Sequence, residues 1–152
     1  FQFYKFLIPI GLSTILRFYY CYPECEPHGI KNERTRSIVK KLLEKGDVGM
    51  NDFPMSGIYE LCKLSKYVVK NMKKVTAPIL IIHSKEDDLT SVKSAKTTYN
   101  KISSIDKEII ILENSYHMVL YDNEKDFVFS KSTDFLDNHK IKQKESECSV
   151  CC

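Results

Sequence analysis

Two short, unbroken apolar runs in the second half of the chain predict two parallel strands. Residues 77–83 read Ala-Pro-Ile-Leu-Ile-Ile-His, and residues 108–112 read Glu-Ile-Ile-Ile-Leu. Runs of this length without polar alternation are typical of strands that are buried on both faces of a parallel sheet. Between them, four apolar residues at helical spacing predict a helix: Val92, Ala95, Tyr99 and Ile102. Strand, helix and strand together predict a right-handed βαβ unit, and therefore an α/β fold.

Helical spacing of apolar residues predicts three further helices. The first covers residues 32–45 and the second covers residues 58–72, with a turn-rich connection over residues 46–57 between them. The third covers about residues 123–139, and Asp122 before it has a side chain suited to a helix N-cap.

The first 20 residues form the most hydrophobic stretch of the chain. A membrane-spanning helix needs about 20 apolar residues without charge, whereas Lys5, Pro9 and Arg17 interrupt this stretch. We therefore expect no transmembrane segment. The density of aromatic residues favours a helix that is buried or faces a substrate, with contact at a membrane surface as the alternative.

The charge balance excludes a dedicated nucleic-acid-binding protein. The 152 residues include 23 basic and 20 acidic ones, a formal net charge of only +3, whereas nucleic-acid binders carry a clear basic excess. The second predicted helix does have lysines without acids between them: Lys63, Lys66, Lys70, Lys73 and Lys74. We expect a solvated helix face there, and a phosphate-binding stripe is the alternative.

Three of the six cysteines lie in the last five residues, at Cys148, Cys151 and Cys152. A disulfide framework spreads its cysteines through the fold, and zinc fingers combine cysteine pairs with histidines at a spacing that this chain lacks. We expect residues 141–152 to be a disordered, reduced tail of a cytoplasmic protein. No metal or organic cofactor is implied.

The predicted sheet is incomplete. Two parallel strands do not make a self-sufficient sheet, because each strand needs neighbouring strands and helices on both faces. The chain begins at Phe1 rather than with Met. We therefore expect the remaining strands to come from sequence before Phe1 or from a partner.

Ionisable residues follow both predicted strands. Asp87 comes in the loop after the first strand, and His117 in the loop after the second. The carboxyl ends of parallel strands lie at one edge of the sheet, where ligands bind in open α/β folds. Acid before histidine is the order of an α/β-hydrolase triad, whose serine comes earlier in the chain. In such a triad the histidine accepts the serine proton, and the carboxylate fixes the histidine tautomer.

Other interpretations of these loops stay open. Asp88 is the alternative acid, and a solvated turn acid and an ordinary loop histidine are the plainer interpretations of both positions. His83 ends a buried strand, so we expect it to be hydrogen-bonded in the core rather than catalytic. Ser84 and Ser115 adjoin the two loops but do not lie on a strand-to-helix elbow, so supporting roles suit them better.

The two loops resemble those of serine α/β-hydrolases. Residues 78–87 resemble the family pattern P-x-L-h-h-H-[GS]-x-x-D, and residues 112–118 resemble the family's histidine loop. Residues 121–126 and 29–34 are similar to bacterial carboxylesterases of the monoacylglycerol lipase and lysophospholipase-like branch. The resemblance covers residues 1 to about 138.

The resemblance implies the C-terminal portion of an α/β-hydrolase fold. Residues 1–75 correspond to a helical cap, and residues 76–140 to the last two parallel strands with their helices. By position, Asp87 matches the triad acid and His117 matches the triad base.

The family's nucleophile motif, G-x-S-x-G, does not occur in the chain. The nearest approach has Ser13 two residues after Gly11, with Ile15 in place of the second glycine. We therefore expect a fragment of a serine carboxylic ester hydrolase, acting on a small-molecule ester or lipid once a missing N-terminal half supplies the serine. The alternative is an inactive fragment, or a binding or regulatory module that pairs with a complementary half.

Overall fold

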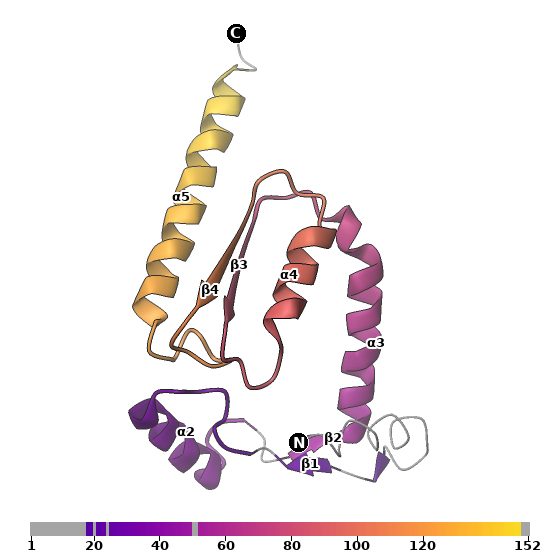
Figure 1. The fold of residues 1–152 in the computed structure, drawn as a ribbon, viewed down its shortest axis with the longest axis vertical. Coiled ribbons are helices and arrows are strands. Elements are labelled where there is room, and N and C mark those ends of the chain that lie inside the picture. The colour runs from indigo at the N-terminus through magenta and orange to yellow at the C-terminus, as the bar shows by residue number, and fades with distance from the viewer. Residues whose placement is uncertain (1–17, 20, 24, 50–51, 150–152) are drawn as a thin grey trace. The chain divides into compact units, whose positions relative to one another are not determined.

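A computed structural model describes residues 18–19, 21–23, 25–49 and 52–149 (Figure 1). Side chains of these residues are described as far as residue 140, except at residue 22. The chain divides into two compact units. One is formed by Phe1–His28 with Arg36–Asn71, and the other by Gly29–Thr35 with Met72–Cys152. The aromatic helix expected in the first 20 residues lies, except for residues 18–19, outside the described residues, and so do the last two cysteines.

The second unit contains the predicted βαβ unit. Strand β3 (Ile79–Ser84), helix α4 (Val92–Lys101) and strand β4 (Lys107–Leu112) follow one another. The two strands are parallel, with Ile79 opposite Lys107 and Ser84 opposite Leu112. Both strands and the helix between them are therefore confirmed.

Helix α5 (Lys125–Ser149) completes this unit. Figure 1 shows α4 and α5 on opposite sides of the β3–β4 pair, and Val128 of α5 is buried at 2% exposure. The predicted end near His139 is too early, because residues 140–149 contain no Pro or Gly and are rich in Lys, Glu and Gln, which favour helix. The prediction that Asp122 caps this helix is wrong, since α5 begins at Lys125 and the carboxylate of Asp122 bonds mainly to other segments.

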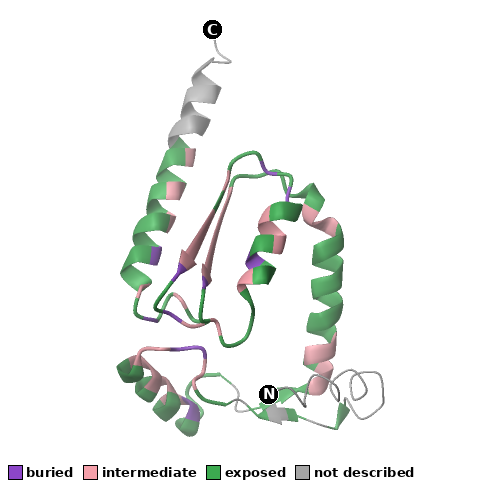
Figure 2. Cartoon of the chain, in the orientation of Figure 1, coloured by how far each residue is buried: buried purple, intermediate pink, exposed green. Residues whose placement is uncertain are grey.

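The strands are less buried than the sequence predicts. Residues 79–83 of β3 are of intermediate exposure, and burial is complete only at the carboxyl ends, at Ser84 and Leu112 (Figure 2). The physical reason is that β3 and β4 form a two-stranded sheet, so within the described residues neither has a second strand beside it. The loops at the carboxyl ends supply the covering that neighbouring strands do not.

Helix α2 (Glu33–Lys45) agrees with its prediction at both ends. Asn32 precedes it, and its Oδ1 accepts a hydrogen bond from Thr35 N at 3.0 Å, as an N-cap side chain does. At the other end Gly46 takes a positive φ of 73°. Its N–H bonds to the carbonyl of Leu43, which satisfies an orphan carbonyl of the last turn.

The first unit also contains a strand pair that the sequence analysis missed. Strand β1 (Cys21–Pro23) pairs antiparallel with β2 (Asp52–Pro54). Three-residue strands that end in proline carry too little pattern to be recognised, and β2 falls in the expected turn-rich connection.

Helix α3 (Met55–Asn71), followed by one 3₁₀ turn, η2 (Met72–Lys74), agrees with the second predicted helix. None of its residues is buried. Its lysines are exposed, as expected of a solvated face. Among the described residues there is no helix both long enough and apolar enough to cross a membrane.

We predict that Leu112→Ala lowers the free energy of unfolding by about 2–5 kcal/mol, because it empties a fully buried position at the end of β4. Leu136→Ala is the matched control, since this side chain is 56% exposed, and it should change stability by less than about 0.5 kcal/mol. Urea denaturation of both variants measures the difference. Equal effects would mean that Leu112 is not part of a packed core.

Candidate active site

Asp87 lies in the loop directly after β3, and that loop is folded around its carboxylate. Oδ1 accepts hydrogen bonds from the backbone N–H groups of Leu89 at 2.8 Å and Thr90 at 2.7 Å. Oδ2 accepts a hydrogen bond from the hydroxyl of Thr90 at 3.1 Å. An aspartate that bonds to the backbone two and three residues ahead forms a local turn by itself, which explains why the chain reverses here before α4. The side chain is only 3% exposed.

His117 lies in the loop after β4 and contacts this carboxylate. Its Nδ1 is 2.9 Å from Oδ2 of Asp87. The contact joins residues 30 positions apart, and it is possible because parallel pairing brings the carboxyl ends of β3 and β4 to one edge. The imidazole is 39% exposed, so it reaches both the buried carboxylate and the surface. A histidine held through Nδ1 has Nε2 for exchanging a proton with a reactant.

The surroundings of Asp87 favour its charged form. Burial by itself raises the pKa of this carboxyl group, but the hydrogen bonds from Thr90 N, His117 and Leu89 N outweigh burial. The pKa of Asp87 is therefore held below its usual value. A carboxylate that stays ionised can stabilise a neighbouring imidazolium throughout the neutral pH range.

The other candidate residues are placed differently. Asp88 is exposed, and the contact with His117 is made by Asp87. His83 lies near the pair, with Nε2 at 3.8 Å from Asp87 Oδ2, which is too long for a hydrogen bond. Within the described part of the chain this buried Nε2 has no hydrogen-bond partner, so the expected core hydrogen bond is absent at this atom.

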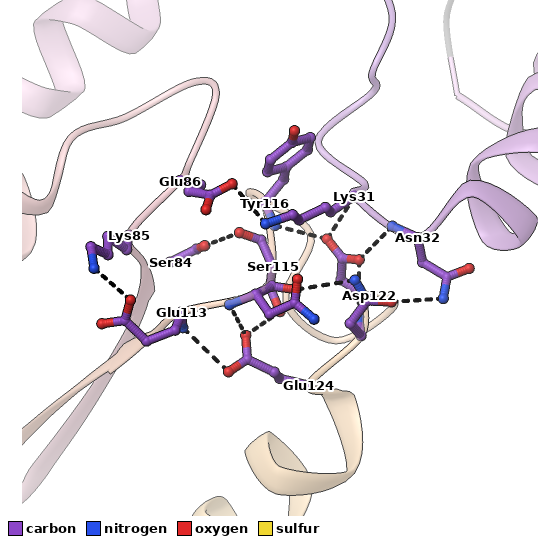
Figure 3. A network of polar contacts seen from close by, with 12 residues as sticks. Lys31, Asn32, Ser84, Lys85, Glu86, Glu113, Ser115, Tyr116, Asp122 and Glu124 are labelled. Carbon is purple, nitrogen blue, oxygen red and sulfur yellow. Dashed lines mark hydrogen bonds and ion pairs between the residues drawn. The ribbon is translucent and has the colours of Figure 1, made fainter.

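The two serines beside the loops connect the loops to each other. Ser84 and Ser115 are completely buried, and the hydroxyl of Ser84 donates to the carbonyl of Ser115. The hydroxyl of Ser115 in turn donates to Glu124 Oε2 at 2.7 Å, and the same oxygen accepts Asn114 N at 2.8 Å (Figure 3). Both serine hydroxyls therefore make structural hydrogen bonds, in agreement with the supporting roles expected from the sequence. Glu124 was not singled out, because nothing in its position along the chain reveals a bond to a loop ten residues earlier.

No group of three or more His, Cys, Asp or Glu residues within the described ranges is arranged to hold a metal ion. The three cysteines whose thiols are described, Cys21, Cys25 and Cys62, are exposed and free. Among the described residues, the site consists of a carboxylate, an imidazole, and the backbone groups and Thr90 hydroxyl that fix the carboxylate.

We predict that Asp87→Asn lowers the free energy of unfolding by about 1–2 kcal/mol near neutral pH, because asparagine keeps the local turn but loses the charge opposite His117. A folded pKa below the unfolded one stabilises the fold at pH values above the unfolded pKa, and this contribution is lost as pH falls through the folded pKa. The difference between the two proteins should thus shrink below about pH 4.

Urea denaturation at about pH 7, 5 and 3 measures this difference, and Asp88→Asn is the matched control at the exposed neighbour. The control should change stability by less than about 0.5 kcal/mol at each pH. A larger and pH-dependent effect at Asp88 would mean that the neighbour is the residue that faces His117.

The chain is similar over part of its length to esterases and lipases. It is 29% identical over 86 residues to a thermostable monoacylglycerol lipase from Bacillus sp. (strain H-257), covering 57% of this chain and 34% of that protein. It is 33% identical over 87 residues to a caffeoylshikimate esterase from Arabidopsis thaliana, covering 55% of this chain and 26% of that protein. It is 25% identical over 130 residues to a carboxylesterase from Bacillus subtilis (strain 168), covering 76% and 53%. The chain spans about half or less of the length of these relatives.

Solved structures of lipolytic enzymes are also similar to this chain in fold. A structure reported for the metagenome-derived lipolytic enzymes LipS and LipT matches with a TM-score of 0.71 and 26% identity, covering 86% of this chain and 49% of that one. The monoacylglycerol lipase of Paleococcus ferrophilus matches with a TM-score of 0.71, covering 88% and 52%. At 14% identity this second match is evidence for the fold alone.

The family model for serine aminopeptidase S33 matches residues 26–126. This range is more than half of the chain and contains Asp87, His117 and both strands that lead to them. The chain therefore belongs to the serine aminopeptidase S33 family and forms part of an α/β-hydrolase fold.

Proposed function

We propose that this chain carries the acid and the base of a serine ester hydrolase, with Asp87 as the acid and His117 as the base. The observation that carries the proposal is the 2.9 Å contact between Nδ1 of His117 and the buried carboxylate of Asp87, at the carboxyl edge of a parallel strand pair. Ligands of open α/β sheets bind at this edge.

The reaction follows from the roles of these two groups. Nε2 of His117 takes the proton of a serine hydroxyl as the serine oxygen attacks the ester carbonyl, and it returns that proton to the leaving alcohol. A water molecule then attacks the serine ester and gives its proton to Nε2, which passes it to the serine oxygen as the carboxylic acid is released. Asp87 stays ionised, holds the proton on Nδ1 and stabilises the imidazolium that forms at each step.

The nucleophile is the part of the proposal that this chain does not carry. G-x-S-x-G occurs nowhere in its 152 residues, and the two buried serines near the pair are bonded to backbone and carboxylate. We propose that the serine is supplied by sequence N-terminal to this chain, so that the chain is the C-terminal portion of the hydrolase. The share of each relative that the chain spans, about half or less, supports this arrangement.

The substrate class proposed is a carboxylic ester of a small molecule or lipid. The similar proteins are a monoacylglycerol lipase, a caffeoylshikimate esterase and a carboxylesterase, and each of them is named as a lipase or an esterase. Residues 1–75 are proposed to correspond to the cap segment of this hydrolase, and residues 76–140 to a segment of its core.

The second candidate is a non-catalytic module or inactive fragment that pairs with a complementary half. The specific observation in its favour is the β3–β4 pair, whose apolar strands are only partly covered within the described part of the chain. Further strands from a complementary half could pair with this surface whether or not that half carries a catalytic serine.

We predict that a fluorophosphonate probe does not label the 152-residue chain, and that labelling appears when the coding sequence upstream of Phe1 is included. In that longer protein His117→Ala should lower labelling and hydrolysis of a p-nitrophenyl ester by at least about 1,000-fold. Intact mass and absorbance at the nitrophenolate band are the readouts.

The matched control is His139→Ala, which removes a histidine that also pairs with a carboxylate, Asp106, at 2.9 Å but lies at the other end of the strands. The longer protein with His139→Ala should be labelled as strongly as the same protein without the substitution. Labelling of the chain by itself that disappears in His117→Ala would place the serine within these 152 residues, and labelling that survives His117→Ala would refute the assignment of the base.

A further inference from the structure

We propose that Asp122 and residues 29–32 form a clamp that positions the two loops carrying Asp87 and His117. The proposal rests on the proposed function of that pair and adds residues that act through it without touching the reactants. We call Asp122 with Gly29, Ile30, Lys31 and Asn32 the loop clamp. All of its members belong to the second unit of the chain.

Asp122 is the centre of the clamp. Its side chain is buried, with the residue 3% exposed, and its carboxylate accepts four backbone N–H groups. Oδ2 accepts Lys31 N at 2.7 Å and Tyr116 N at 2.8 Å, and Oδ1 accepts Asn32 N at 2.8 Å and Asn123 N at 2.9 Å (Figure 3). A buried carboxylate is costly unless its oxygens are hydrogen-bonded, so these donors cannot be displaced freely. One side chain therefore ties the residue before His117 to residues 31 and 32, which lie 91 and 90 positions before Asp122.

Gly29 brings the clamp into contact with the histidine itself. Its carbonyl accepts the N–H of Met118 at 2.7 Å, and its φ of 70° is one that residues with a Cβ adopt at a cost. A Cβ at this position would lie 3.1 Å from Cβ of His117 and 3.1 Å from Cγ of Met118. The backbone of the clamp thus packs closely against Cβ of His117, and a larger residue at position 29 would push that atom away.

Lys31 connects the clamp to both loops through its side chain. Its ammonium group is 2.7 Å from Oε2 of Glu86, the residue before Asp87. The same group lies 5.7 Å from the ring centre of Tyr116, the residue before His117. Figure 3 shows the Lys31 side chain reaching from the clamp toward Glu86 beside the Tyr116 ring. Lys31 therefore contacts the neighbour of the acid and the neighbour of the base.

These contacts give the clamp a specific task. The hydrogen bond between Asp87 and His117 joins two loops, and a catalytic pair needs its geometry held within about 0.5 Å. Glu124 and Ser84 fix the part of the histidine loop nearest β4, whereas Asp122 and Gly29 fix residues 116 and 118 on either side of the histidine. We classify Asp122 and Lys31 as positioning residues.

The test is the NMR signal of the His117 Nδ1–H proton in the 152-residue chain, recorded without any substrate. A proton bonded to a carboxylate gives a downfield signal that exchanges slowly with water. Asp122→Asn should speed that exchange by at least about tenfold, because an amide oxygen cannot replace both carboxylate oxygens and its NH₂ group faces N–H donors. Asp126→Asn is the matched control at an exposed aspartate near the start of α5 and should leave the signal unchanged.

Two further variants keep the test decisive where Asp122→Asn prevents folding. Lys31→Met keeps the backbone N–H that bonds to Asp122 but loses the ammonium group, and Gly29→Ala places a methyl group against Cβ of His117. Faster exchange in these variants, with the amide signals of β3 and β4 unchanged, supports the clamp. An unchanged His117 signal in every clamp variant that folds overturns it.

Asp87→Asn separates this proposal from the proposed function. Loss of the His117 signal in Asp87→Asn together with its retention in the clamp variants refutes the clamp alone. Retention of the signal in Asp87→Asn refutes the acid–base pair, on which both proposals rest.

Discussion

Parallel pairing of β3 with β4 is the constraint on which the site depends. Because the strands run in the same direction, the chain must cross over through α4 before it can begin the second strand, and both strands then end at the same edge. The register sets Ser84 opposite Leu112, so the two following loops start side by side. An antiparallel pair of the same sequences would send Asp87 and His117 to opposite ends of the sheet.

Those loops are held mainly by carboxylates that accept hydrogen bonds from backbone N–H groups, rather than by apolar packing. Asp87, Asp122 and Glu124 each accept hydrogen bonds from two or more backbone N–H groups in the loops around them. A carboxylate bound in this way specifies direction and distance, whereas apolar burial is non-directional. Bonds of this kind therefore suit a site in which a carboxylate oxygen must lie 2.9 Å from an imidazole nitrogen.

The sequence was sufficient for the βαβ unit, the helices over residues 32–45 and 58–72, and the pair of loops that carry Asp87 and His117. These features have local signals: an unbroken apolar run, helical spacing, or an ionisable residue after a strand. It was not sufficient for features that depend on contacts between distant segments. Asp122 looked like a helix cap because aspartate before a helix usually is one, and only the fold reveals that its oxygens bond to residues 31, 32 and 116. The partial exposure of β3 agrees with the expectation that two parallel strands do not make a self-sufficient sheet.

The bond between Asp122 and Lys31 also has a consequence for the order of folding. It joins residues 91 positions apart, whereas the Asp87–His117 contact spans 30 and the bond from Ser115 to Glu124 spans 9. The entropy lost on closing a loop grows with the number of residues enclosed, and contacts of long sequence separation slow folding. The βαβ unit and its histidine loop can form from the last half of the chain, but residues 29–32 must return from much earlier in the sequence to complete the surroundings of His117. We therefore expect the geometry of the pair to be completed last, after the strands that present it have formed.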